Sequence, residues 1–480
     1  MSRRLFGPFN RVEGDLEVQV EIDAGRVTGA WVNPPLFRGF EQILHGKDPR
    51  DALVYTPRIC GICSVSQSVA AAAALAELIG LEPPPNGRLA INLILACENL
   101  ADHLTHFYLF FMPDFAREAY RDRPWFEAVR ARFKAQSGSA AGEVLPARAR
   151  LLHLTGILAG KWPHSLAIQP GGSTRAAGAQ DKVQLAAVVG LFRRFLERTL
   201  FADRLENVAA LDSAQALAAW AEAHAESDFG RFLHLSDDLG LDALGRASDR
   251  FMSYGAYAQE DGHLFRRGVW DGELRALDPA GITEDVSCSW MQSQNGPKHP
   301  YQGATLPAAE KQGAYSWCKA PRLNGQVVET GALARQVVDG HPLIRDLVAA
   351  SGGNVRNRVV ARVLELARVV PAMESWVRAL KPGAAFCAHA PLPEEGEGAG
   401  LVEAARGSLG HWLRVRNGRI LNYQIIAPTT WNFSPRDGSG VPGALEQALV
   451  GTPVGEQGPE AVALQHVVRS FDPCMVCTVH

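Results

Sequence analysis

Two Cys-x-x-Cys pairs stand near opposite ends of this chain. The first is Cys60-Gly-Ile-Cys63 and the second is Cys474-Met-Val-Cys477, just before the terminal His480. A zinc knuckle or a local redox motif needs only a short loop, so pairs this far apart place a different demand on the fold. If the fold brings them together, four thiolates meet in the interior and the C-terminus is buried beside them. Four soft sulfur ligands favour zinc, copper(I), nickel or iron over magnesium or calcium.

Spacing alone leaves three interpretations of these pairs open. Each pair could form the disulfide of a redox site. The two pairs together could hold a structural zinc ion, and their spacing alone favours this interpretation over a catalytic metal. The other four cysteines are scattered, and this does not resemble a disulfide framework. They are Cys97, Cys288, Cys318 and Cys387. We therefore expect a reducing, cytoplasmic location.

Composition excludes several classes of protein. The chain has 480 residues, of which 47% are hydrophobic and 21% charged, as in a globular protein. The net charge of -3 provides no basic surface for nucleic acid. No apolar run approaches the length of a membrane span. The N-terminus has two arginines but lacks the apolar stretch of a signal peptide.

The hydrophobic pattern predicts a mainly α (α+β) fold, a large helical bundle with small antiparallel sheets in a single integrated domain, residues 1–480. Apolar periodicity predicts helices over residues 66–79, 87–111, 147–158, 182–211, 359–380 and 459–468. Alternating residues predict hairpins over 16–33 and 403–426, and short strands over 251–285. A polar loop rich in Trp and Tyr covers 287–325.

The residues around the cysteine pairs are more specific than their spacing. The first pair reads Arg58-Ile-Cys-Gly-Ile-Cys-Ser64, and the second reads Ser470-Phe-Asp-Pro-Cys-Met-Val-Cys-Thr-Val-His480. Together they resemble the two metal-binding motifs of the nickel–iron hydrogenase large subunit. Further matches to this family follow in order along almost the whole chain, at residues 11–14, 37–41, 102–108, 160–164, 170–172, 319–322, 403–412 and 428–437.

This resemblance implies a catalytic metal site on the four cysteines. Cys60 and Cys474 would be terminal ligands of nickel. Cys63 and Cys477 would bridge nickel to an iron that carries cyanide and carbon monoxide. A zinc ion held by four cysteines then becomes the minor alternative.

The resemblance also implies roles for residues around the iron ligands. Arg406 would hydrogen-bond one cyanide with its planar guanidinium, although an isolated arginine more often forms a surface salt bridge. Thr429 would donate its hydroxyl to the other cyanide. Asp102 and Asp472 would hold Arg406 in place. The family usually has proline at the position of Ala405. The alanine leaves the backbone next to Arg406 less rigid than a proline would.

Two further sites follow from the same resemblance. Heterolytic cleavage of hydrogen releases a proton, and the glutamate of the Arg-x-Glu-Gly motif, here Glu13, would carry it away from a cysteine. Glu41, His480 and the backbone carbonyl of Ile425 would bind a hard cation, usually magnesium. Histidine is an unusual ligand for magnesium, so the position of this site is better indicated than its metal.

Several residues depart from the common family pattern. Gln67 stands where the family usually has histidine, and glutamine can hydrogen-bond a sulfur or a carbonyl but cannot titrate. Ile62 and Phe110 are bulkier than the valine and leucine common at these positions, which in the family line the path of gas to the metals. Their bulk would narrow this path and predicts an oxygen-tolerant site. The equal alternative is that both side chains only pack in the core. In catalytic relatives the precursor continues past the histidine matched by His480 and is clipped after metal insertion.

These departures resemble the hydrogen-sensing, regulatory branch of the family. We expect a low-turnover hydrogen sensor that controls hydrogenase gene expression, with a histidine kinase as a possible partner. The alternative is a respiratory uptake hydrogenase large subunit. The related subunit of respiratory complex I is disfavoured because it lacks the four cysteines. The remaining cysteines lack the spacing of an iron–sulfur cluster, so electrons need an iron–sulfur small subunit as partner.

Overall fold

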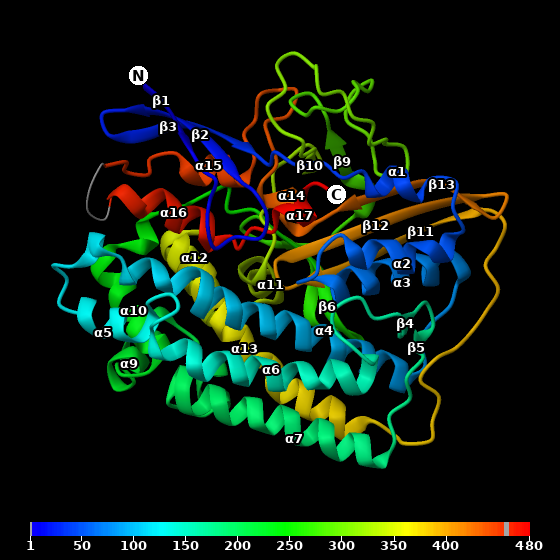
Figure 1. Ribbon diagram of the computed structural model, residues 1–480, viewed down its shortest axis with the longest axis horizontal. Coiled ribbons are helices and arrows are strands. Elements are labelled where there is room, and N and C mark those ends of the chain that lie inside the picture. The colour runs from blue at the N-terminus through cyan, green and yellow to red at the C-terminus, as the bar shows by residue number, and fades with distance from the viewer. Residues whose placement is uncertain (1, 456–459) are drawn as a thin grey trace.

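The computed structural model describes residues 2–455 and 460–480. It is mainly helical with small antiparallel sheets, as predicted (Figure 1). Four long helices pack on one another to form a bundle. They are α4 (Pro85–Thr105), α6 (Ser139–Ala159), α7 (Ala179–Phe195) and α13 (Val355–Ala379). Their apolar faces supply much of the core, which includes the buried Leu100, Leu154 and Val363.

The sheets are antiparallel and mostly three-stranded. The first contains β1 (Ser2–Phe6) and the predicted hairpin, β2 (Glu17–Asp23) and β3 (Arg26–Asn33). The second contains β11 (Gly396–Ala404), β12 (Gly407–Arg416) and β13 (Arg419–Ile426). The third contains β6 (Phe251–Gln259), β7 (Gly262–Trp270) and β8 (Leu274–Arg275). Two-stranded pairs join β4 (Ile168–Gln169) to β5 (Gly172–Ser173) and β9 (Ile282–Asp285) to β10 (Ala320–Leu323).

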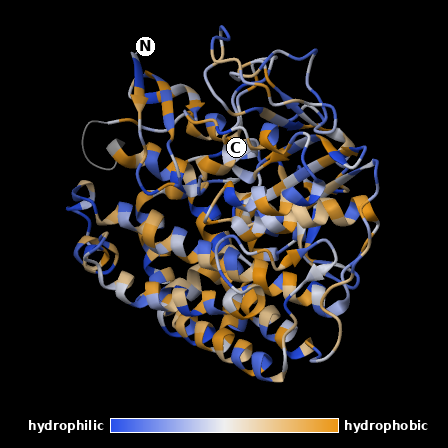
Figure 2. Ribbon diagram, turned by 45° about the vertical axis from the view of Figure 1, so that its right-hand side comes forward, coloured by the Kyte–Doolittle hydropathy of each residue, from blue (hydrophilic) through white to orange (hydrophobic). Residues whose placement is uncertain are grey.

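Shorter helices complete the fold, some on the surface and some buried between the bundle and the sheets. They are α1 (Phe40–Leu44), α2 (Ala52–Tyr55), α5 (Phe126–Phe133), α8 (Leu205–Ala209), α9 (Ala214–Ala223), α10 (Asp228–Leu239), α11 (Ala332–Asp339), α12 (Pro342–Ser351), α14 (Pro428–Asn432), α15 (Ala444–Leu449), α16 (Glu460–Ser470) and α17 (Met475–Thr478). The predicted helix over 459–468 corresponds to α16, and residue 459 lies outside the described residues. No helix in the described ranges is both long and apolar enough to cross a membrane. Figure 2 shows polar and apolar residues mixed along the long helices.

Two predicted helices differ from the observed ones. The helix expected over 182–211 is wrong as one element, because α7 ends at Phe195, a π-helical turn covers Leu196–Phe201, and Ala202 adopts a left-handed backbone. The helix expected over 87–111 becomes a π-helical turn at His106–Phe111. A π turn adds a residue to the helical repeat without breaking the run of apolar side chains, so periodicity does not reveal it.

Close packing of α3 (Ser64–Ile79) on the second sheet positions the first cysteine pair. A Cβ atom on Gly400 of β11 would lie 1.8 Å from the carbonyl oxygen of Ala70, and one on Gly398 would lie 2.2 Å from that of Ala74. Only glycine therefore permits this contact between the helix and the strand. The C-terminus is brought to the same region, where the Gly39 amide donates to the carbonyl of His480 at 3.2 Å.

Candidate metal centre

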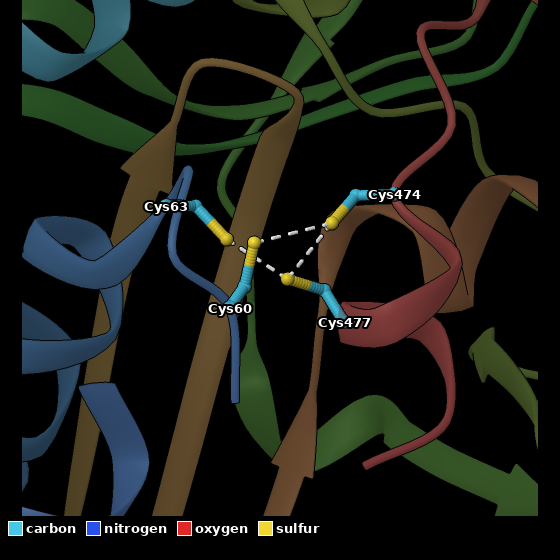
Figure 3. Close-up of side chains that lie close together, drawn as sticks. All are labelled: Cys60, Cys63, Cys474 and Cys477. Atoms are coloured by element: carbon cyan, nitrogen blue, oxygen red, sulfur yellow. Dashed lines mark hydrogen bonds between the residues drawn. The ribbon is translucent and has the colours of Figure 1, made fainter. Parts of the chain in front are cut away.

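The fold brings the two cysteine pairs into one buried cluster (Figure 3). The four Sγ atoms all lie within 4.8 Å of one another. Cys63 and Cys477 are separated by 2.8 Å, Cys474 and Cys477 by 3.2 Å, and Cys60 and Cys474 by 3.5 Å. All four are free thiols, so neither pair forms the disulfide that spacing left open.

Local structure at the start of two helices directs the thiols toward one another. Cys63 is the N-cap of α3 and Cys474 is the N-cap of α17. The start of α3 is capped from another helix, because the carboxylate of Glu98 on α4 accepts from the amides of Val65 and Ser66, both at 2.8 Å. An acidic group at a helix N-terminus satisfies free amides and stabilises the helix dipole. Glu98 was not predicted, since no local pattern pairs it with Cys63.

Burial and shared hydrogen bonds split the acidities of the thiols. Hydrogen bonds from Cys474 and Cys477 lower the pKa of Cys60. The pKa of Cys63 is raised by the same sharing of protons and by burial, and that of Cys477 by burial first. A buried set of sulfurs that shares its protons is suited to a soft divalent cation, which replaces those protons and neutralises the thiolates.

Arg406 lies beside the cysteines and is held by the two predicted aspartates. Its Nη2 atom donates to Asp102 at 3.1 Å and to Asp472 at 3.2 Å, and its Nε atom donates to the Asp472 carbonyl at 2.9 Å. Burial opposes the charge, but Asp102 and Asp472 outweigh it and raise the pKa of Arg406 above its ordinary value. Burial raises the pKa of Asp102 to about 8.

Hydrogen-bond donors remain available at this site. Arg406 Nη1 is buried and has no partner among the described residues. The Thr429 hydroxyl oxygen accepts from the Cys474 amide at 3.2 Å, which leaves its proton free to donate. A buried, unpaired guanidinium N–H is costly unless an acceptor occupies the site. Small anionic acceptors such as cyanide on a neighbouring iron fit these donors.

Glu13 lies against the second cysteine segment. The Met475 amide donates to the Glu13 carbonyl at 2.7 Å, and the Glu13 amide donates to the Pro473 carbonyl at 3.4 Å. Burial, followed by the charge of Cys60, raises the pKa of this half-buried carboxyl, while Arg406 and Arg38 oppose the shift. A carboxylate with a raised pKa beside a cysteine is suited to accept the proton of a thiol.

Gln67 is bound to a histidine of the second sheet. Its side-chain oxygen lies 2.8 Å from His411 Nε2, and His411 Nδ1 lies 2.7 Å from the Tyr423 hydroxyl. Burial lowers the pKa of His411 to about 3, so the ring is neutral, donating to Gln67 and accepting from Tyr423. Gln67 thus uses its side-chain oxygen to bind His411. His411 escaped prediction because it is distant in sequence.

The residues proposed for a hard cation also meet. Glu41 Oε1 lies 3.4 Å from His480 Nε2 and accepts from the Ile425 amide at 2.8 Å. Burial would raise the pKa of Glu41, but Lys319 and His480 outweigh it and lower this pKa to about 2. Glu41 Oε2 is buried without a partner among the described residues. An ionised, partly unsatisfied carboxylate of this kind fits magnesium. The carbonyl of Ile425, rather than its amide, remains the predicted ligand.

Ile62 and Phe110 are both half-buried. Ile62 lies between Cys60 and Cys63, and its amide donates to Cys60 Sγ at 3.3 Å. Phe110 belongs to the π-helical turn after α4, and its carbonyl accepts from Arg11 at 3.1 Å. Their control of gas access stays a prediction.

The fold and this site define a soft-metal protein, with a buried four-thiol cluster and free hydrogen-bond donors beside it. The family model described as nickel-dependent hydrogenase matches residues 38–117 and 143–480. The chain therefore belongs to the nickel-dependent hydrogenases, as a large subunit of an enzyme that cleaves hydrogen.

Relatives match along the whole chain. The periplasmic [NiFeSe] hydrogenase large subunit of Desulfomicrobium baculatum is 30% identical, over 98% of this chain and 94% of its own. The uptake hydrogenase large subunit of Azotobacter chroococcum is 28% identical, over 100% of this chain and 95% of its own. The solved Ni-Fe-Se hydrogenase from D. vulgaris Hildenborough has a TM-score of 0.84 and 31% identity, with 100% of both chains covered.

Proposed function

We propose that this hydrogenase large subunit acts mainly as a hydrogen sensor that controls the expression of other hydrogenases. The observation that carries the proposal is Gln67. It stands on α3, the helix that follows Cys63, at a position where the family usually has histidine, and its side-chain oxygen is bound to His411. A side chain that cannot titrate at this position fits slow turnover and signalling better than rapid proton transfer.

The proposed cofactor is a nickel–iron centre with cyanide and carbon monoxide on iron. Cys60, Cys63, Cys474 and Cys477, whose sulfurs lie within 4.8 Å of one another, would hold the metals. Arg406 Nη1 and the Thr429 hydroxyl would donate to the cyanides, and Asp102 and Asp472 would keep the guanidinium aligned. When bound, the centre supplies the redox chemistry of hydrogen cleavage, and Glu13 would take the proton from a cysteine sulfur.

A second cation, magnesium, would lie at Glu41, His480 and the carbonyl of Ile425. The buried, unpaired oxygen of Glu41 supports this site. Glu41 connects it to the second sheet through the Ile425 amide. The cation would therefore hold the C-terminal residue beside the N-terminal segment.

The proposed partners are an iron–sulfur small subunit and a histidine kinase. Among the described residues, the four cysteines are the only group of three or more His, Cys, Asp or Glu side chains close enough to hold a metal ion, and the other cysteines lack the spacing of an iron–sulfur cluster. Electrons would therefore leave through an iron–sulfur small subunit, and the signal would pass to a histidine kinase. We propose that residues 1–480 work as one integrated domain in the cytoplasm.

The alternative is an energy-conserving uptake hydrogenase. It is favoured by the full-length match to a relative named as an uptake hydrogenase large subunit. The two roles predict different consequences of losing the gene.

Deletion of the gene distinguishes the two roles. A sensor deletion should abolish hydrogen-dependent expression of other hydrogenases, measured with a transcriptional reporter. In a strain that expresses those hydrogenases constitutively, growth on hydrogen should survive the deletion. Loss of growth in that strain, with expression still responsive to hydrogen, would establish the uptake role instead.

A further inference from the structure

Arg406 lies in a tight turn whose geometry is not the favoured one. The turn joins β11 to β12, with Ala404 paired with Gly407, so Ala405 and Arg406 are its two central residues. Two-residue hairpins favour turns with a positive φ at the first central position. Neither Ala405 nor Arg406 has a positive φ. The backbone of the turn that carries Arg406 is therefore not of a type favoured in two-residue hairpins, and contacts from outside the turn must stabilise it.

The space around Gly407 shows how closely this turn is packed. Gly407 has a φ of 129°, and a Cβ atom there would lie 2.5 Å from the amide nitrogen of Gly331. Gly331 is the N-cap of α11. The turn thus packs directly on the start of α11.

Arg335 of α11 binds the backbone of the turn. Its Nη1 atom donates to the Ala404 carbonyl at 2.7 Å, and its Nη2 atom donates to the Ala405 carbonyl at 3.1 Å. These are the two residues that precede Arg406. The Arg335 side chain is fully buried, so water does not compete for these carbonyls.

Two carboxylates hold Arg335 in this orientation. Glu365 of α13 accepts from Arg335 Nη2 at 3.0 Å and from Nε at 3.2 Å, and Glu403 accepts from Nη1 at 2.9 Å. Burial opposes the charge of Arg335, but Glu365 and Glu403 outweigh it and raise its pKa. The planar guanidinium can bind two carboxylates and two carbonyls at once, which a lysine ammonium cannot do.

Glu365 also lies close to the helix on the other side of Arg406. Glu365 contacts His103 Nε2 at 3.2 Å, without a hydrogen bond, and His103 is adjacent in the chain to Asp102, which binds Arg406. Glu365 therefore packs between Arg335 and the helix that supplies one of the carboxylate partners of Arg406.

We propose that Arg335 is a positioning residue for Arg406, and that it supplies from outside the turn the rigidity that Ala405 does not provide. The inference rests on the proposed role of Arg406 as a donor to a cyanide on iron. Arg335 itself touches neither the cysteines nor the proposed ligands. Its effect would pass through the carbonyls of Ala404 and Ala405.

The test uses infrared spectra and nickel content of the full assembled protein. Arg335→Lys should retain nickel but shift or broaden the cyanide stretching bands, because Arg406 Nη1 is no longer held in one place. Adding Ala405→Pro to Arg335→Lys should restore narrow bands, since proline fixes φ near -65° and is favoured at the first central position of a turn with negative φ.

Arg322→Lys is the matched control. Arg322 is also buried and binds one carboxylate, Asp437, together with the carbonyls of Pro435 and Val441. This variant should lose stability without moving the cyanide bands.

Three results would overturn the inference. Unchanged, narrow cyanide bands in Arg335→Lys would do so while leaving the proposed cofactor standing. Band changes or nickel loss that Ala405→Pro does not reverse would show that Arg335 supports the fold in general. Absence of cyanide bands from the unmodified protein would remove the proposed cofactor, and the inference with it.

Discussion

Glu13 is the residue proposed to take a proton from the cysteine cluster, and its half-buried carboxyl has a raised pKa. Glu13→Gln keeps the shape and some hydrogen bonding of the side chain but removes its ability to carry a proton. We expect the metals to remain bound and hydrogen–deuterium exchange to fall about 100-fold or more, the usual scale of a lost acid–base group. Normal exchange in this variant would assign the proton path to other residues. Glu17→Gln is the control, because Glu17 lies in the first sheet, where its carboxylate accepts a hydrogen bond from Asn33 of the neighbouring strand.

Ile62 and Phe110 test whether side-chain bulk limits access of oxygen. The double change Ile62→Val and Phe110→Leu removes volume without touching a cysteine. We expect hydrogen cleavage to persist and inactivation by oxygen to become faster, measured as activity remaining after exposure to air. Unaltered oxygen tolerance would mean that protection comes from the electronics of the site or from the partner's clusters.

At the scale of residues, the sequence predicts the cysteines and the residues that motifs carry, but not their buried partners. The four thiols meet as two matched motifs require. Glu98, His411 and Arg335 bind parts of the site from other elements. The sequence predicts only a helix at Glu98 and a strand at His411, and it predicts no element at Arg335. Such partners are selected by tertiary contact, which leaves no local pattern.

The contact between α3 and β11 carries a prediction at the scale of elements. A Cβ atom on Gly400 would meet a helix backbone oxygen at 1.8 Å, and a backbone atom cannot rotate away. Gly400→Ala should therefore push α3, and with it Cys63, away from the sheet. We expect a loss of about 3 kcal/mol in the free energy of unfolding, the upper part of the range for overpacking, together with reduced nickel content.

Gly156→Ala provides the control for this change. Gly156 lies within α6, its φ is not positive, and a Cβ atom there would have no neighbour within 4 Å. Alanine should raise stability by about 1 kcal/mol through helix propensity. Equal nickel content and equal stability in the two variants, measured by metal analysis and denaturant unfolding, would refute the steric role of Gly400.

Element type was more predictable than element continuity. The hairpin β2–β3 and the helix α13 follow from alternation and periodicity, with small errors at their ends. The break between α7 and α8 does not, because the π-helical turn at Leu196–Phe201 keeps an apolar sequence. Strand β1 was also missed, since its residues are mostly exposed and lack a buried alternation.

At the scale of the whole molecule, the meeting of the two chain ends follows from the cysteine motifs and not from the helix pattern. Cys60 and Cys474 are 414 residues apart in sequence, yet their sulfurs lie 3.5 Å apart. Helix and strand patterns would allow many arrangements of the bundle and the sheets. The requirement that four thiols share one metal site selects among them, and the resemblance to a known family supplied the rest.

Metal content therefore carries the prediction for the whole molecule. A nickel–iron centre held by both cysteine pairs would cross-link the two ends of the chain and stabilise their contact. We expect the assembled protein to contain nickel and active-site iron in equal amounts and little zinc. Removing the metals should speed amide exchange in α17 and around Cys63, because the cross-link is lost, while the β2–β3 hairpin keeps its protection. Stoichiometric zinc without nickel in an active preparation would contradict the assignment of the metals. Amide exchange that rises equally in the hairpin and in α17 would mean that the metals stabilise the whole fold without specifically joining its ends.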